Sequence, residues 1–416
     1  MNDSESANHP QIWWSNSIFF VAVHLAALAG IYWIPLTLVS WKTIALTYAM
    51  WQLAEFGITI GYHRLWSHRA FRATAGVRLI LAVLGSAGFQ GSIKWWCLRH
   101  RLHHRFTDDP VHDPYAATRG LLYSHMGWIF FKPTYTRMEL VDREDLDRDP
   151  VVRFQHKYYI PLALFFGFAV PPLIGALWHD ALGAFVWAGL VSRVAVWHCT
   201  FFVNSLAHWD GLQPFSDEDT SRGNFLLAVM TSGEGNHNFQ HAFPHDYRSG
   251  PWLATWDPSK WVIFVLYKLG FVTGLRQARE VDLKEAMAYM NHKHVHGVPP
   301  TDDDEEHNIQ SEGKLQTWTL EETKLYLKEH PHRCLVLLRG WVVDVTTYLG
   351  EHPGGASLLR KYAVSLKDED SEGDQQNHRD ASWAFDGGLN NHSRAAVKRM
   401  KELRLAKIET QPVVVS

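Results

Sequence analysis

The chain has 416 residues and a formal net charge of −3, with 46% hydrophobic residues. This near-neutral balance argues against a nucleic-acid partner, which a basic surface would favour. The three cysteines, Cys97, Cys199 and Cys334, are few and scattered, so they exclude a disulfide framework and favour a reducing compartment. The histidine count of 25 is high, and the positions of these residues dominate the functional argument.

Four apolar stretches are long enough to cross a bilayer, which takes about 20 residues. Short links join them in pairs, so they predict two helical hairpins. The N-terminal segment 1–10 lacks the basic region of a signal peptide, and we therefore expect the first stretch to be an uncleaved span. The stretches are Ile18–Val39, Thr43–Gly61, Tyr158–Trp178 and Leu182–Leu206.

Two shorter apolar segments, Val77–Ile93 and Trp261–Leu275, each contain a basic residue. We expect them to lie at the membrane interface rather than to span it. The loop Arg64–Lys157 is rich in Arg and Lys, which places it in the cytosol by the positive-inside rule. The pattern predicts an all-α integral membrane domain with four transmembrane helices and a cytosolic helical cap.

Three histidine clusters lie in or near this cap, with almost no cysteine beside them. Imidazole suits iron, zinc, copper and nickel, and several histidines around one pocket indicate more than one metal ion. Histidines that cap helices or contact lipid headgroups are the alternative, which three clusters together disfavour. The clusters are HRLWSH (63–68), HRLHH (100–104) and HNFQH (237–241).

The spacing within the clusters restricts how they meet. The second cluster has its three histidines at i, i+3 and i+4, which is one face of a helix. His63 and His68 would diverge by about 140° on an ideal helix, so we expect the helix to end between them, the second span itself ending at about Gly61. Asn204 and His208 close the fourth span at i and i+4, where polar residues indicate function.

Five strings in this order resemble the motifs of membrane acyl-CoA Δ9 desaturases, in particular the fungal stearoyl-CoA type, over about residues 41–275. They are HRLWSHR (63–69), HRLHHRFTDDPVHDP (100–114), RGLLYSHMGW (119–128), NSLAHWDG (204–211) and GEGNHNFQHAFPHDYR (233–248). The resemblance implies four spans, cytosolic histidine boxes and a di-iron centre. It also implies removal of two hydrogens from C9 and C10 of a saturated acyl-CoA, with consumption of O2 and two electrons.

The resemblance further assigns the ligands of the two irons, and it assigns to Asn204 the role of holding a metal-bound water. The implied ligands are His63, His68, His100, His103, His104, His208, His237 and His241. Carboxylates commonly orient such rings from behind. The candidates for that role are Asp108, Asp109, Asp113 and Glu234.

The third cluster departs from the family pattern His-x-x-His-His, because Gln240 occupies its middle position. Three interpretations stay open. Gln240 binds iron through its oxygen or through a bridging water, His245 takes the ligand position, or the site is impaired and the protein has another role. We favour the first, because the other ligand candidates and an electron-donor domain are in place.

Other residues are candidates for substrate contacts. Glu55 lies inside the second span, about 12 Å from His63 along a helix, which is too far for it to bind the same metal. We expect it to line an acyl tunnel together with Trp51. The phosphates of CoA favour basic side chains near the tunnel mouth. The candidates are Arg101, Lys132 and Arg137.

The composition changes at residue 301, where an acidic run begins. We therefore divide the chain into a membrane desaturase domain (1–300), an acidic linker (301–314) and a small α+β domain (315–410). Within the last, Leu335–Leu338 and Trp341–Val343 predict two strands around an Arg339-Gly340 turn.

Four strings of this last domain resemble cytochrome b5. They are WTLEE (318–322), VDVTTYL (343–349), HPGG (352–355) and HSRAA (392–396). The resemblance implies His352 and His392 as the axial ligands of haem b, with His378 as the alternative to His392. Two axial histidines favour electron transfer over O2 binding. Between the ligands, about Ser365–Asp380, we expect a disordered loop.

Together these resemblances predict a multi-pass stearoyl-CoA 9-desaturase of the endoplasmic reticulum membrane, with both domains facing the cytosol. Tethering raises the effective concentration of the b5 donor, and NADH-cytochrome b5 reductase would supply its electrons. The expected partners are acyl-CoA, O2, this reductase and the lipid bilayer. Two alternatives stay open: a histidine-box hydroxylase or desaturase of other regiochemistry, and a non-catalytic haem protein with an impaired di-iron site.

Overall fold

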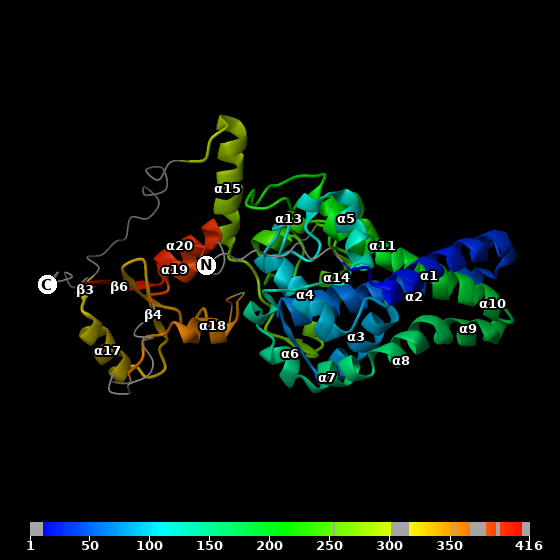
Figure 1. Cartoon of the computed structure of the whole chain (residues 1–416), viewed down its shortest axis with the longest axis horizontal. Helices are drawn as coiled ribbons and strands as arrows, with labels where there is room; N and C mark the ends of the chain where they lie inside the picture. Colours follow the sequence, from blue (N-terminus) through cyan, green and yellow to red (C-terminus); the bar gives the residue numbers. More distant parts are fainter. Residues whose placement is uncertain are drawn as a thin grey trace. The chain divides into compact units, whose positions relative to one another are not determined.

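The computed structural model describes residues 11–252, 254–300, 316–350, 352, 354–366, 380–387 and 392–409. Its backbone contacts divide the chain into two units. The first unit comprises the described residues up to Met290, except residues 140–142, and the second comprises those three residues and the described residues from Asn291 onwards. Figure 1 shows a helical first unit and a second unit with a small sheet.

Three helical segments of the first unit are long and apolar enough to cross a membrane, among the residues that the structure describes. They are α1 (Trp14–Trp33), the run Tyr159–Trp178 and the run Ala181–His208. They correspond to the first, third and fourth predicted spans. The second predicted span is helical but does not meet the same condition, because it carries Gln52 and Glu55 among its apolar residues.

The remaining helices of this unit are shorter than these three segments, and α2 packs along the run Ala181–His208. Val77–Ile93, predicted as one helix, is divided between α3 and the start of α4, and Trp261–Leu275 is divided between α14 and β2. The short elements are α2 (Trp41–Phe56), α3 (Ala75–Ala87), α4 (Ile93–Arg105), α5 (Leu121–His125), α6 (Glu144–Arg148), α7 (Pro150–Lys157), α12 (Phe225–Met230), α13 (His237–Ala242), α14 (Pro258–Lys268), α15 (Glu280–His296), β1 (Arg72–Ala73) and β2 (Val272–Thr273).

The long runs are not uniformly α-helical. Tyr159–Trp178 consists of α8 (Tyr159–Leu164), η6 (Phe165–Ala169), α9 (Val170–Gly175) and η7 (Ala176–Trp178). Ala181–His208 consists of α10 (Ala181–Ala184), η8 (Phe185–Val191), α11 (Ser192–Ser205) and η9 (Leu206–His208). Of these segments η6 and η8 are π-helical, and π-turns inside helices frequently mark functional sites.

The longest π-helix, η2 (Gly57–Ser67), continues α2 and carries the first histidine cluster. The helix ends between His63 and His68, as expected, but at Ser67 instead of near Gly61. The backbone N–H of His68 donates to the carbonyl of His63 at 3.0 Å. A bond between residues five apart is the π pattern, and it turns two side chains that an α-helix would separate towards the same side.

Three imidazoles connect α1 to the neighbouring helices. His24 Nε2 lies 3.1 Å from His198 Nε2, and His198 Nδ1 lies 2.9 Å from His125 Nε2. His125 Nδ1 is 3.0 Å from the hydroxyl of Ser205. These contacts join α1, α11 and α5, and Phe20 of α1 packs on Trp197 of α11 with ring centroids 4.6 Å apart.

The second unit contains a four-stranded sheet in the order β3-β6-β5-β4. Both predicted strands are confirmed, the second one residue longer, and positive φ values at Arg339 and Gly340 form the turn between them. Residues 301–314 and 367–379, with the predicted linker, His378 and most of the predicted loop, lie outside the described residues. The elements are β3 (Gln316–Trp318), α17 (Leu320–Glu329), β4 (Leu335–Leu338), β5 (Trp341–Asp344), α18 (Ala356–Lys361), α19 (Ser382–Phe385), α20 (Arg394–Glu402) and β6 (Arg404–Ile408).

Candidate functional site

Eight histidines of the first unit gather into two groups of four, each with ligand nitrogens within 4.8 Å of one another. These are the eight histidines that the resemblance assigned. The first quartet is His63, His68, His100 and His104, and the second quartet is His103, His208, His237 and His241. Burial of three side chains in each quartet, with the fourth half-buried, keeps the groups from bulk water.

Two short helices each direct side chains to both quartets. On α4, whose N-terminus is capped by Ser92, the consecutive residues His103 and His104 enter different quartets. On α13, His237 and His241 belong to the second quartet, while Gln240 contacts the first. Because each helix presents side chains to both groups, the two quartets form one site with two centres.

The nitrogens within each quartet are spaced as metal ligands are. His68 Nε2 lies 2.8 Å from His100 Nε2, and His237 Nε2 lies 3.0 Å from His241 Nε2 and 3.1 Å from His208 Nε2. Nitrogens bonded at 2.0–2.1 Å to one ion, at right angles, are about 3 Å apart. Within the described part of the chain, the buried Nε2 atoms of His63 and His103 have no hydrogen-bond partner. The residues present therefore fit two metal ions.

The protonation states of the imidazoles agree with this geometry. Burial, together with the neighbouring imidazoles, lowers the pKa of His68, His100, His104 and His237 well below the usual histidine range. These rings are therefore neutral at physiological pH, as metal ligation requires. His103 differs: burial opposes its charged form, but the carboxylate of Asp113 outweighs burial and raises the pKa of His103.

Carboxylates orient the second quartet from behind. His103 Nδ1 lies 2.9 Å from both oxygens of Asp113, and His241 Nδ1 lies 3.0 Å from Asp219. His208 Nδ1 is 2.9 Å from the hydroxyl of Thr220, which itself donates to Asp108 at 2.8 Å. Each contact turns Nε2 of its ring towards the quartet.

Not all of these partners were foreseeable. Asp108 and Asp113 were predicted, whereas Asp219 and Thr220 were not, because no spacing rule connects them to a histidine cluster. Asp109, also predicted, lies 2.9 Å from Nδ1 of His112, a residue of neither quartet.

The first quartet has a different support. His63 Nδ1 lies 3.2 Å from Glu234, whose other oxygen accepts hydrogen bonds from Arg64. Burial opposes ionisation, but the neighbouring Arg64 guanidinium outweighs it and lowers the pKa of Glu234 to about 2. Arg64 also donates to Asp257 at 2.9 Å, so one buried cation holds two carboxylates.

Gln240 is placed against the first quartet. It is 4% exposed, and its amide nitrogen lies 2.8 Å from His68 Nε2 and 3.2 Å from His104 Nε2. Its amide oxygen is buried and has no hydrogen-bond partner in the described ranges. Amide oxygen and nitrogen are assigned from their surroundings, and a half-turn of the amide directs the oxygen to the quartet. His245 instead contacts the backbone carbonyl of His68 at 2.7 Å through Nδ1.

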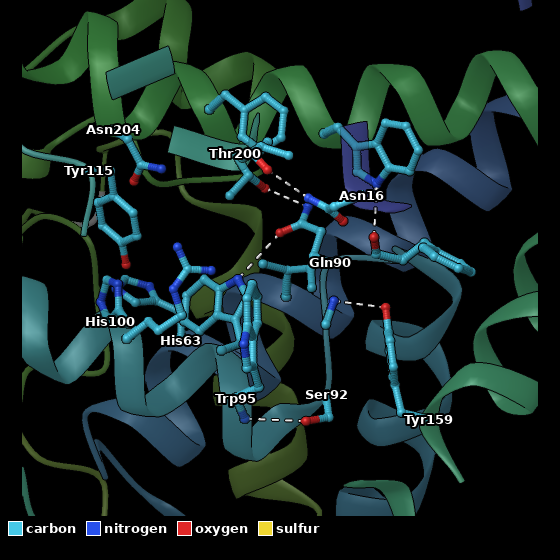
Figure 2. A pocket seen from close by; sticks show the side chains of 18 of the residues that line it. Asn16, His63, Gln90, Ser92, Trp95, His100, Tyr115, Tyr159, Thr200 and Asn204 are labelled. Carbon is cyan, nitrogen blue, oxygen red and sulfur yellow. Dashed lines mark hydrogen bonds between the residues drawn. The ribbon is translucent and has the colours of Figure 1, made fainter. Parts of the chain in front are cut away.

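A cavity of about 460 Å³ reaches the first quartet, a volume typical of small-ligand sites. Figure 2 shows His63 and His100 in its wall together with Trp95, Tyr115 and Asn204. Of the predicted substrate contacts, Glu55 lines the cavity, whereas Trp51, Arg101, Lys132 and Arg137 are not among the lining residues.

Arg101 is engaged elsewhere. Its guanidinium binds both oxygens of Asp145, at 2.9 and 2.7 Å, and donates to the backbone carbonyls of Trp66 and Ser67. Asp145 also accepts from Arg69. This network fixes the backbone within the first cluster and just after it, a structural task that the sequence did not indicate.

In the second unit, the rings of His352 and His392 are nearly parallel, 25° apart, with centroids separated by 6.3 Å. His352 Nδ1 faces the carbonyl of Gly355 at 3.3 Å, and His392 Nδ1 faces that of Phe385 at 2.9 Å. A centroid separation of 6.3 Å leaves room for one iron between the two rings, given bonds of about 2 Å. The residues therefore fit a haem held by two histidines.

Membrane-length helices with two buried histidine quartets define the first unit as a histidine-rich membrane metalloprotein. Residues 39–253 match the fatty acid desaturase family, and residues 319–365 match the cytochrome b5-like heme/steroid binding domain. The chain belongs to the fatty acid desaturase family and carries a C-terminal cytochrome b5 domain, which confirms both resemblances.

Three curated proteins illustrate the similarity. The "Probable acyl-CoA desaturase" of Schizosaccharomyces pombe is 35% identical over 95% of this chain and 77% of its own length. "Acyl-CoA desaturase 1" of Saccharomyces cerevisiae is 38% identical over 85% of this chain and 65% of its own length. "Delta(9)-fatty-acid desaturase fat-5" of Caenorhabditis elegans is 38% identical over 58% of this chain and 73% of its own length.

Proposed function

We propose that this protein is an acyl-CoA desaturase that introduces a cis double bond between C9 and C10 of saturated acyl-CoA, with stearoyl- and palmitoyl-CoA as substrates. The pairing of two histidine quartets with a cavity in one unit supports the proposal most directly. The names of the similar fungal and nematode proteins support the acyl-CoA substrate and the Δ9 position.

The ligand assignment follows the quartets. His63, His68, His100 and His104 would hold one iron with Gln240 as a neutral fifth ligand. His103, His208, His237 and His241 would hold the other, with Asn204 binding a water. Two irons so held would supply the oxidising chemistry that removes hydrogen from unactivated methylenes. The protein's own task is to orient the rings through Asp113, Asp219 and Glu234, and to keep the acyl chain in a site shielded from water.

The fused haem unit would deliver the electrons, with His352 and His392 as axial ligands of haem b. We propose that NADH-cytochrome b5 reductase reduces it. We also propose four membrane helices, with α2 and η2 as the fourth beside the three apolar segments. The endoplasmic reticulum membrane, with both units on the cytosolic side, and the boundaries 1–300, 301–314 and 315–410 belong to the same proposal.

The presence of glutamine at position 240 is the observation that supports a competing function. If the amide cannot replace an imidazole, the first quartet would hold iron poorly, and the chain would be a haem-bearing membrane protein without desaturase activity. The fit of Gln240 between His68 and His104 argues for a working site instead.

Product analysis tests the proposal. Membranes containing the chain, supplied with stearoyl-CoA, NADH and reductase, should form a monoene with its double bond at C9. A hydroxylated product would show a different histidine-box activity, because it gains oxygen instead of losing two hydrogens. No product from membranes with a normal b5 spectrum would contradict the proposal for this substrate.

Metal analysis separates the two candidate functions independently of turnover. The desaturase proposal predicts two non-haem irons per haem. A protein with an impaired centre would bind one or none and would regain iron on the substitution Gln240→His. The haem ligands are tested by His352→Ala and His392→Ala, each of which should abolish the b5 absorption spectrum.

A further inference from the structure

The cavity wall contains a buried arginine that the predicted substrate contacts did not include. Arg99 is 4% exposed and lines the cavity. Its guanidinium carbon lies 4.0 Å from the ring centroid of Trp95 and 4.4 Å from that of Trp128. The rings of Tyr135 and Tyr115 follow at 5.5 and 5.7 Å. Such an aromatic cage stabilises a cation through ring faces without neutralising its charge.

Two donors in this part of the wall have no acceptor. Arg99 Nε and Trp128 Nε1 are both buried and have no hydrogen-bond partner among the residues that the structure describes. Within the described ranges no carboxylate forms an ion pair with Arg99, whereas the equally buried Arg64 has two. A buried donor without an acceptor is unfavourable. Two of them in one cavity wall therefore indicate an acceptor that a ligand brings.

Two other polar residues of the lining, Asn16 and Gln90, are already hydrogen-bonded. Asn16 donates to the carbonyl of Ile129 at 2.9 Å, and Gln90 donates to Thr200 at 2.7 Å. Figure 2 shows the hydrogen bond between Gln90 and Thr200. Arg99 Nε and Trp128 Nε1 thus remain two donors of the cavity wall without an acceptor among the described residues.

The position of Arg99 on α4 relates it to the metal centre. The ring of Trp96 stacks on His100, with centroids 4.9 Å apart and planes 22° apart. Trp95 and Arg99 form the adjacent stripe of the same helix, about 100° away. The cavity also continues to the apolar side chains of Ile58 and Val203. An acyl chain that passes His100 can therefore extend its apolar tail towards Ile58 and Val203, while its thioester end lies towards Arg99.

We propose that Arg99, with Trp128, binds the thioester carbonyl oxygen of acyl-CoA and so fixes which carbon pair reaches the metal centre. This inference rests on the proposed function. A guanidinium stacked between rings keeps its in-plane N–H groups for an oxygen acceptor. Phosphate oxygens share this chemistry, but their hydration disfavours a caged position with 4% exposure. The carbonyl is at a fixed number of bonds from C9, so holding it sets the position of the double bond.

The experiment compares wild type, Arg99→Met and Trp128→Phe on two substrates, stearoyl-CoA and stearoyl-pantetheine, which lacks the nucleotide and all phosphates. We expect Arg99→Met to lower kcat/KM about tenfold or more, as for loss of a charge-assisted hydrogen bond. The loss in kcat/KM should be the same for both substrates. Part of the product should carry its double bond at positions next to C9 instead of at C9. Trp128→Phe, which keeps a ring but removes a donor, should act in the same direction by about three- to tenfold.

Two results would overturn the inference. A loss confined to stearoyl-CoA would show that Arg99 binds a phosphate, and unchanged kinetics with unchanged product position would show that it binds neither. Arg153→Met, at an exposed basic residue outside the cavity wall, is the matched control and should change nothing. If Arg99→Met fails to fold, Arg99→Lys retains the caged charge without the planar fork and should still spread the product positions. Wild-type monoene formation decides the proposed function separately.

Discussion

The first and second quartets use the same ligand type but differ in the groups behind the rings. Asp113 and Asp219 contact imidazoles of the second quartet directly, and Asp108 acts through Thr220. Behind the first quartet we find Glu234, whose charge is shared with Arg64, and Gln240 contributes a neutral amide. The second centre is therefore surrounded by more negative charge.

This difference predicts that the two centres bind metal with different affinities. Carboxylates behind imidazoles raise ligand basicity and fix ring orientation, so the second quartet should bind its metal more tightly. The first quartet, with its weaker amide, should release metal first. The variants below test this asymmetry, beginning with the largest expected effect.

Removing one histidine from either quartet should abolish desaturation and lower the content of non-haem iron. His103 and His104 are neighbours on α4 but belong to different quartets. We expect His103→Ala and His104→Ala each to lose activity and to lower non-haem iron per haem from two towards one, measured by metal analysis against haem absorbance. If either variant kept both irons, the assignment of its histidine would be wrong.

The substitution Asp219→Asn should weaken the second quartet without removing a ligand. The amide lacks the charge that holds His241, and loss of such a partner lowers metal affinity or activity about 10- to 100-fold. Competition with a chelator measures the affinity. The control is Asp210→Asn, an exposed residue of the same loop region; equal effects in the two variants would refute a specific role for Asp219.

Substitutions of Gln240 should make the first quartet hold its iron either more tightly or less tightly. Gln240→His adds an imidazole and should slow the release of one iron to a chelator, while Gln240→Leu removes the amide and should accelerate it, each by up to about tenfold. The rate of release of the other iron is the internal reference. Identical release curves for all three proteins would show that Gln240 has no contact with metal.

The substitution Asp109→Asn should have the smallest effect. Its carboxylate contacts His112 and the local backbone instead of a quartet histidine. We expect kcat/KM and iron content to remain within about twofold of wild type, because surface changes away from a site are usually nearly neutral. A loss as large as that of Asp219→Asn would place Asp109 among the groups that support the metal.

The sequence predicted much of this site because its signals are local. Helical spacing placed the histidines of the second cluster on one face, and the strings around all three clusters revealed the family. Two strands of the second unit were predicted for the same reason, since two short apolar runs and a Gly-containing turn lie within ten residues. The second membrane span was less clear, because Gln52 and Glu55 lower the hydropathy of a helix that must also lead into η2.

The spacing of histidines in the sequence could not determine which of them belong to the same quartet. Nothing local distinguishes His103 from His104, and their separation into two quartets depends on where α13 and η9 pack. Asp219 was missed because its partner, His241, is 22 residues away in the chain. Arg101 was assigned to substrate from its charge alone, but Asp145 and two backbone carbonyls already bind it.

By itself, then, the sequence determined the residue types, the helices and strands that carry them, and the family. The tertiary structure decided which histidines share a centre, how η2 brings His63 beside His68, and that Arg99 instead of Arg101 faces the cavity. The physical reason is that periodicity orients side chains only within one element. Metal ligation and substrate contact depend on distances of a few ångströms between elements, which packing of the whole unit sets.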